Sequence, residues 1–235
     1  MQLPFFYEEV LQEKSPMVLS DESSRHIVQV LRMKEGENIQ ITNGKGILLT
    51  TEITLAHKKK TEVKIIKKET HPPGMAQSAI AISLVKNTGR FEWFLEKATE
   101  IGVTEIIPLR CKRTEKSHFR EDRMKMILVS AMLQSRQVWL PILFPPTKYP
   151  DFISQSNSYD KKFIAHCIED QKRELKEFTG QDHSSKIVLI GPEGDFTPEE
   201  IEQAINEHFI PVSLGTNRLR TETAAIVAAV MLNIS

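Results

Sequence analysis

The chain has 235 residues with 31 basic and 31 acidic side chains, so its formal net charge is zero. Such a chain has no global field that attracts polyanions, and any nucleic-acid surface must be a local patch. No apolar run approaches the roughly 18 residues of a membrane-spanning helix, and the opening MQLPFFYEEV lacks the basic segment of a signal peptide. Cys111 and Cys167 form no CxxC motif, which predicts a cytoplasmic protein without a zinc site.

Residues 1–72 mostly have the pattern of short strands. One early helix interrupts them, capped by Ser20 or Asp21 and carrying apolar side chains between Ile27 and Leu31. Short strands with a single helix predict a small β-barrel. The expected strands, separated by turn residues such as the NGKG at 43–46, are 38–42, 47–56 and 61–66.

The cluster His71-Pro72-Pro73-Gly74 breaks regular structure, so we place a domain boundary there, with residues 73–235 as the second domain. Strands and helices alternate after it, which predicts a parallel sheet with helices on both faces. Nothing in this periodicity indicates a knot. The expected strands are 79–85, 105–109, 162–165 and the apolar runs IVLIG and IPVSLG, and the expected helices are 90–101, 120–137, one after the TPEE capping box at 197–200, and 224–232.

The last of these helices, AAIVAAVML, is apolar on every side, with Thr221 or Thr223 as its expected cap. A helix of this kind must be covered on all sides. One sheet covers only part of it, so a two-fold interface through small residues such as Ala228 and Ala229 predicts a homodimer.

Two glycine loops follow the apolar runs, at residues 191–195 (GPEGD) and 215–221 (GTNRLRT). Open α/β sheets bind ligands at the carboxyl ends of their strands, so the two loops predict one pocket for a flat ligand with polar edges. As an isolated motif, GPEG is more often a plain turn. Here a strand precedes it and a capped helix follows it, which favours the pocket.

Two local basic patches stand out, at residues 57–68 with six lysines against one glutamate, and at residues 110–125 with seven basic side chains against three acids. Lys and Arg that neutralise phosphates supply much of nucleic-acid affinity. A solvated strand face and a solvated loop explain the same patches equally well.

Several motifs, in order along nearly the whole chain, resemble the RsmE family of 16S ribosomal RNA uridine-N3 methyltransferases, which belongs to the SPOUT class. The matching segments are His26-x-x-Gln29-Val30-Leu31-Arg32, Lys86 to Val103 with Pro108, IGPEGDFTxxE from Ile190, and LGxxxLRTETA from Leu214. The resemblance implies a trefoil-knotted C-terminal α/β domain that binds S-adenosylmethionine (SAM), a PUA-like RNA-binding barrel at residues 1–72, and dimers of the knotted domains.

The resemblance also implies site residues. The cofactor would contact Leu189, Ile190, Gly191, Glu193, Gly194, Leu214, Gly215, Leu219 and Arg220. RNA of the small ribosomal subunit would contact His26, Arg32, Lys58, Lys59, Lys60, Lys86, Arg90 and Arg113. The expected catalytic residues are Arg220, Glu193 and, out of register by one position, Arg136.

This chain departs from the family pattern at three positions. It has Asp195 where glycine is usual, Asn217 beside Arg218 where arginine is usual, and Gln137 after Arg136. Aspartate tolerates a left-handed backbone, so the first departure is compatible with the loop. His166 follows the predicted strand 162–165. The sequence allows two roles for it, lining the pocket or packing in the structure.

Methylation at N3 requires removal of the N3 proton, and Glu193, Glu222 and water all remain conceivable acceptors. For Glu222 the main expected role is to complement the dipole of the last helix. No metal is required, and no ligand cluster is present in the sequence. Two other functions stay open: a SPOUT methyltransferase acting on tRNA or on a ribose hydroxyl, and an rRNA-binding assembly factor without catalysis.

Overall fold

The computed structural model describes residues 2–12, 15–74, 77–115, 118–168, 172–179 and 183–233. The chain divides into two compact units, Met1–Pro73 with Met132–Leu140, and Gly74–Ala131 with Pro141–Ser235. The sequence division had left residues 132–140 with the second domain. They join the N-terminal unit because Gly46 N–H donates to Val138 O at 2.9 Å, and Leu140 N–H donates to Gly44 O at 2.9 Å.

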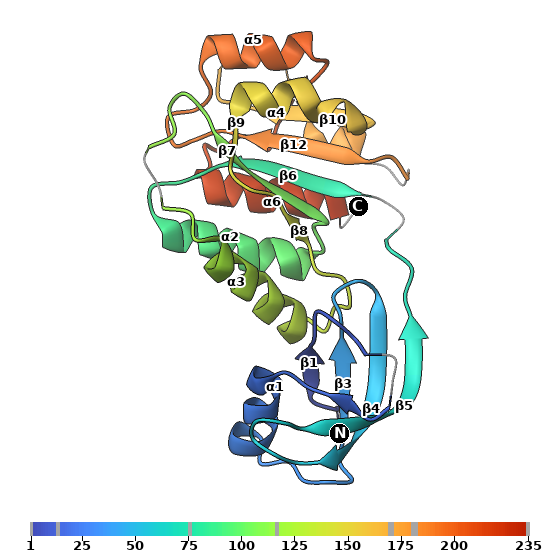
Figure 1. Ribbon diagram of the computed structural model, residues 1–235. Coiled ribbons are helices and arrows are strands. Elements are labelled where there is room, and N and C mark those ends of the chain that lie inside the picture. The colour runs from blue at the N-terminus through green and yellow to red at the C-terminus, as the bar shows by residue number, and fades with distance from the viewer. Residues whose placement is uncertain are drawn as a thin grey trace. The chain divides into compact units, whose positions relative to one another are not determined.

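The N-terminal unit is a curled five-stranded sheet with a short helix packed against it (Figure 1). The strand order is β1-β3-β4-β5-β2, in which β1 pairs with β3 in parallel and the other pairs are antiparallel. Its strands are β1 (Phe5–Tyr7), β2 (Met17–Val18), β3 (Asn38–Thr42), β4 (Ile47–Leu55) and β5 (Glu62–Thr70).

The helix of this unit begins where the sequence predicts. Ser20 Oγ accepts the Ser23 N–H at 3.2 Å and caps α1 (Asp21–Arg25), which continues as a π-helical turn, His26–Val30. Ile27 is fully buried in the core of the unit. The other buried apolar members of this core are Phe6, Met17, Leu19, Ile39, Ile41, Leu49, Ile53 and Val63.

The C-terminal unit is built on an eight-stranded sheet whose strand pairs are all parallel. The order is β11-β13-β10-β12-β6-β7-β8, and β9 pairs with β7. The strands are β6 (Ser78–Ser83), β7 (Glu105–Arg110), β8 (Ile142–Leu143), β9 (Thr147–Lys148), β10 (Lys161–Ala165), β11 (Arg173–Glu174), β12 (Lys186–Ile190) and β13 (Ile210–Ser213). Every residue of β6 and β12 is buried, as expected for a parallel sheet covered on both faces.

Helices cover both faces of this sheet (Figure 1). On one face, Phe152 and Ile153 of α4 and Ile201 and Ala204 of α5 join the sheet's core cluster. On the other face, α6 packs against β6, β12 and α2. The helices are α2 (Thr88–Ile101), α3 (Glu121–Gln134), α4 (Tyr149–Gln155), α5 (Pro198–Asn206) and α6 (Thr221–Asn233), with 3-10 turns at Ser156–Ser158 and Leu175–Phe178. None of the helices in the described part of the chain is long and apolar enough to cross a membrane.

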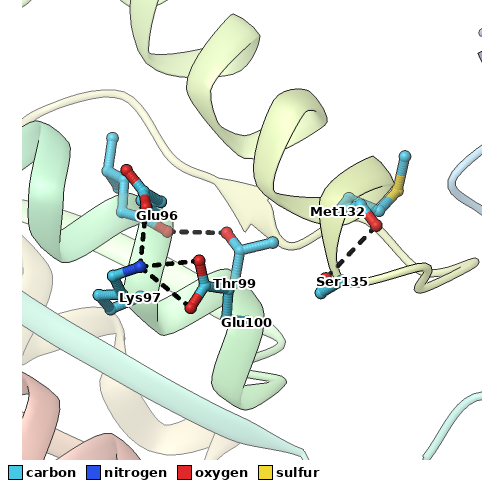
Figure 2. Close-up of polar contacts among 7 residues, drawn as sticks. Glu96, Lys97, Thr99, Glu100, Met132 and Ser135 are labelled. Atoms are coloured by element: carbon cyan, nitrogen blue, oxygen red, sulfur yellow. Dashed lines mark hydrogen bonds and ion pairs between the residues drawn. The ribbon is translucent and has the colours of Figure 1, made fainter.

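Helix α2 ends as the sequence predicts, because Gly102 adopts a left-handed conformation with φ 96°. Figure 2 shows its last turns, where Lys97 Nζ lies 2.8 Å from Glu96 Oε1 and 2.9 Å from Glu100 Oε1. These hydrogen bonds raise the pKa of the half-buried Lys97 ammonium. The same view shows Ser135 Oγ donating to Met132 O, just after α3 ends at Gln134, three residues earlier than predicted.

Two expectations for α6 are wrong. The helix begins at Thr221, and Ala224 N–H donates to Arg220 O, so Arg220 occupies the cap position and both threonines lie inside the first turn. The small residues expected at the interface also do not lie on the open side of the helix: Val230 is 38% exposed, whereas Ala228 and Ala229 are fully buried. The small alanines therefore pack inside the unit itself, and the open side lies elsewhere on the helix.

Candidate functional site

A cleft of about 300 Å³ lies in the C-terminal unit, where strands β10 and β12 end and helix α6 begins. The parallel pairing aligns Ala165 of β10 with Ile190 of β12, so the segments after both strands emerge side by side. The cleft is lined by Ala165, Cys167, Ile190, Gly191, Pro192, Glu193, Asp195, Arg218, Leu219, Arg220, Thr221 and Ala224.

The loop after β12, residues 191–196, is held by contacts with the segments that follow three neighbouring strands. Towards β10, Asp195 Oδ2 accepts the Cys167 N–H at 2.8 Å. Towards β7, Arg113 donates to Gly194 O at 2.7 Å, and towards β6, Glu193 Oε1 accepts the Lys86 N–H at 3.4 Å. The loop geometry is therefore determined by tertiary contacts as well as by its glycines.

Asp195 adopts φ 66°, so the aspartate takes the left-handed conformation that the sequence allowed at this position. Its second oxygen, Oδ1, accepts the Phe196 N–H at 2.8 Å. Both carboxylate oxygens thus bind backbone N–H groups, which explains how a non-glycine residue is stabilised there.

The loop before α6 contains Gly215 with φ 115°, a conformation that L side chains rarely adopt. No described heavy atom lies within 4 Å of the position a Cβ would take, so the conformation and not crowding requires glycine. Ser213 Oγ accepts the Gly215 N–H at 3.2 Å. Arg218 and Leu219 of this loop line the cleft, and Asn217 does not.

The predicted cofactor residues fall into two groups. Ile190, Gly191, Glu193, Leu219 and Arg220 line the cleft together. The structure does not bring the others into the lining: Leu189 is fully buried in the sheet, and Gly194, Leu214 and Gly215 belong to the framework of the two loops.

Sequence reasoning missed several lining residues, of which Cys167 and Arg218 carry the most chemistry. Cys167 is exposed at the end of β10, one position beyond the His166 that the sequence singled out. His166 is not in the lining, and its carbonyl accepts a hydrogen bond from Lys172 Nζ at 2.6 Å. The signal available in the sequence was the position directly after a predicted strand. This signal could not show whether His166 or Cys167 faces the cleft.

The basic residues predicted to contact RNA differ in whether they already have a partner within the protein. In the N-terminal unit, Lys58 and Lys59 are exposed in the turn before β5, while Lys60 Nζ lies 2.9 Å from Glu62. His26 and Arg32 are exposed as well, with the His26 ring edge-on to Phe6 at 5.7 Å between centroids. Arg32 adopts φ 54°.

In the C-terminal unit the predicted RNA residues are already paired. Lys86 Nζ lies 2.9 Å from Glu115, which raises the pKa of the Lys86 ammonium. The guanidinium of Arg113 binds the loop carbonyl described above, so its first role is to hold that loop. Lys116, which belongs to the basic patch at 110–125, lies outside the described residues.

Arg90 is close to Glu222, with Nε 3.7 Å from Oε1. Glu222 is 6% exposed in the first turn of α6, and its Oε2 makes no hydrogen bond with the described residues. The buried carboxylate faces α2 and is absent from the cleft lining. This geometry favours the structural role that the sequence gave Glu222.

Arg136, a predicted catalytic residue, belongs to the N-terminal unit. Its guanidinium donates to Leu3 O at 3.1 Å and to Gln40 Oε1 at 2.7 Å, and stacks over the Phe5 ring. The planar guanidinium of Arg136 therefore makes hydrogen bonds and a ring contact within the N-terminal unit. Arg136 is not among the residues that line the cleft, and the prediction of a catalytic role has no support here.

The two cysteines differ sharply. Burial raises the pKa of the Cys111 thiol to about 12, and the nearby Glu200 carboxylate acts in the same direction. Cys167 is exposed in the cleft. Within the described ranges, no group of three or more His, Cys, Asp or Glu side chains could hold a metal ion.

Two known families match the chain. One, described as RNA methyltransferase domain, matches residues 72–233, and the other, described as RNA methyltransferase PUA domain, matches residues 19–66. The ribosomal RNA small subunit methyltransferase E of Mesomycoplasma hyopneumoniae is 31% identical over 70% of this chain and 71% of its own length.

Solved structures agree. A protein from Porphyromonas gingivalis, described as a probable rRNA-methyltransferase, is 34% identical, with a TM-score of 0.89 over 99% of both chains. The ribosomal RNA small subunit methyltransferase E of Neisseria gonorrhoeae, solved bound to S-adenosyl methionine, is 28% identical, with a TM-score of 0.88 over 99% of this chain and 98% of that one. Because the methyltransferase domain alone spans more than half of the sequence, the chain belongs to the RNA methyltransferase family, and the resemblance of its motifs to RsmE is confirmed.

Proposed function

We propose that this protein transfers a methyl group from SAM to N3 of a uridine in 16S rRNA of the small ribosomal subunit. The observation that carries the proposal is the cleft at the ends of β10 and β12, built from the two glycine loops whose motifs identify the family. When bound, SAM supplies an electrophilic methyl group. The protein acts as a homodimer in the cytoplasm.

The cleft fits this cofactor in size and in chemistry. A volume of about 300 Å³ is at the lower end of the range for small-molecule sites. Ile190, Leu219 and Ala224 line the cleft with apolar atoms, and Gly191 lines it as well and would present its backbone to an adenine edge. Two acids and two arginines line the same space, which suits a ligand carrying both an amino and a carboxylate group.

Glu193 is better placed than Glu222 to accept the N3 proton. It is exposed in the cleft lining, whereas the Glu222 carboxylate is buried and faces Arg90. Glu193 would accept the N3 proton as the uracil nitrogen becomes a nucleophile. Arg220 lines the same cleft and would stabilise negative charge on O2 or O4 of the uracil.

The N-terminal unit would hold the RNA through exposed basic residues. Lys58 and Lys59 offer charges for phosphates, with His26 and Arg32 as further contacts. In the C-terminal unit, the exposed Lys86 and Arg113 would contact RNA only as far as their present partners allow.

A second copy of the chain would cover the open side of α6. Val230 is 38% exposed, and Val227 and Met231 next to it on the helix are half-exposed. Positions 227, 230 and 231 share one face of a helix. An apolar face of this kind, on a helix that buries Ala225, Ala228 and Ala229 inside its own unit, favours a C2 interface.

The decisive test has two parts. Isothermal titration of the purified protein with SAM should give saturable binding, and mass mapping of 16S rRNA should locate one methylated uridine that is missing from cells without the protein. Glu193→Gln should lower kcat measured at saturating SAM. A protein that binds RNA but no SAM would be an assembly factor, and a product on tRNA or on a ribose hydroxyl would redirect the assignment within the class.

A further inference from the structure

Asp195 links two segments that are 28 positions apart in the chain and that both line the cleft. Oδ2 accepts the N–H of Cys167, which follows β10, and Oδ1 accepts the N–H of Phe196, which follows in its own loop. Both distances are 2.8 Å, the length of a strong charge-assisted hydrogen bond.

Each of the two linked segments also has contacts of its own. The loop of Asp195 has two further contacts, through Arg113 at 2.7 Å and Lys86 N–H at 3.4 Å. On the other wall, Lys172 Nζ donates to His166 O at 2.6 Å and to Ile168 O at 2.7 Å. The exposed Cys167 lies between these two residues and donates its N–H to Asp195 in the first wall. The Asp195 carboxylate therefore joins two walls of the cleft that are each held by further contacts on their own side.

The backbone at Asp195 shows that this link has a cost. A φ of 66° is uncommon for a residue with a side chain and is retained when surrounding contacts compensate. Glycine would adopt the same conformation without strain, but it would leave the Cys167 N–H without its acceptor.

We infer that Asp195 is a positioning residue for the cofactor: its carboxylate keeps the Cys167 wall in place, so that the cleft is shaped before SAM enters. This inference rests on the proposed function and adds to it a residue that acts through the shape of the cleft. A site that is preformed does not lose affinity to the ordering of its walls on binding.

Two substitutions separate the link from the fold. Asp195→Gly removes the carboxylate and relieves the backbone strain, so the protein should stay folded. Asp195→Asn keeps one acceptor oxygen and still tolerates a positive φ, so it should behave between wild type and Asp195→Gly. Glu199→Gln, on the exposed start of α5, is the matched control for loss of a nearby acidic charge.

If the wall is ordered in only about one tenth of Asp195→Gly molecules, the apparent Kd for SAM rises about tenfold. The KM for SAM should rise with it, while kcat and the KM for RNA stay near wild type. Without cofactor, the Cys167 thiol should react faster with a thiol reagent, and hydrogen exchange at the Cys167 amide should accelerate. Saturating SAM should restore both signals towards wild type.

The outcomes are distinguishable. A wild-type protein that does not bind SAM would refute the proposed function. If the wild type binds SAM and Asp195→Gly matches it in Kd and in Cys167 reactivity, the positioning role is overturned. Equal losses in thermal stability, kcat and both KM values would also overturn it, because they would indicate a general structural role.

Discussion

In the N-terminal unit, basic side chains lie on an exposed turn and strand, and their partners are acids on the same surface, such as Glu62 beside Lys60 at 2.9 Å. In the C-terminal unit, the charged side chains around the cleft bind backbone groups of neighbouring loops, as Asp195 and Arg113 do. The first arrangement offers charge that tolerates small displacements, since phosphate neutralisation depends on the number of charges. The second arrangement fixes the positions of the loops around the cleft, so the displacement of a single loop disrupts the site. Variants in the two units should therefore fail in different ways.

The largest difference in SAM affinity should come from replacing a positive-φ glycine by valine, once in each unit. Gly215→Val places a β-branched side chain at φ 115° in the loop that carries Arg218 and Leu219, so we expect SAM affinity to fall by more than about 100-fold in a folded protein. Gly36→Val introduces the same kind of strain at φ 86° in the N-terminal unit and should leave SAM affinity unchanged. Titration with SAM, with circular dichroism as the folding check, measures both. Equal affinities for the two variants would contradict the assignment of the second loop to the cofactor.

Helix α6 allows a sharper test of the C-terminal unit. Val230→Glu puts a charge on the open side of the helix, so we expect a folded monomer with methylation reduced at least about tenfold. Ala228→Glu buries an unpaired charge inside the unit and should unfold it, because Ala228 is fully buried. Sedimentation measures the first effect and thermal melting the second. A wild-type protein that sediments as an active monomer near 26.9 kDa would rule out the dimer.

Charge reversal tests the N-terminal unit alone. Replacing Lys58, Lys59 and Lys60 by glutamate should weaken RNA binding roughly 10- to 100-fold and reduce the slope of log K against log salt by about two. SAM affinity should not change, because these residues lie outside the cleft lining. The matched control is Lys176→Glu, at an exposed lysine of the C-terminal unit paired with Glu174. An unaltered salt slope in the triple variant would mean that the lysine turn is only a solvated surface.

The smallest expected effect is a difference between two thiols. With a pKa of about 12, Cys111 is about one part in 10,000 thiolate near pH 8, so a thiol reagent should modify only Cys167 in the native protein. Cys111 should react once denaturant exposes it, or as the pH approaches its pKa. Because Cys167 lines the cleft, SAM should slow its modification severalfold. Two thiols reacting at equal rates in the native state would show that the burial of Cys111 is incomplete.

Local sequence patterns were sufficient to predict the helix caps and the alternation of strands and helices. Ser20 and Thr197 cap their helices, Gly102 ends α2, and the alternation of strands and helices after residue 74 gives a parallel sheet. These features depend on a few neighbouring residues and on backbone preferences that act over one or two turns. The motifs also determined the family and the loops after β12 and β13, because the residues that make each loop are contiguous.

Which segments share the cleft depends on strand pairing between distant parts of the chain. Pairing of β10 with β12 brings Cys167 beside Asp195, and no local pattern encodes which strands become neighbours or in which register they pair. The same limit applies to Arg136, because its partners Leu3 and Gln40 are 133 and 96 positions away in the sequence. It also explains α6, whose uniformly apolar sequence could not reveal that Val230 faces outwards while Ala228 is buried. Hydrophobicity determines that a helix is buried on average, but the side that is covered depends on the elements packed against it.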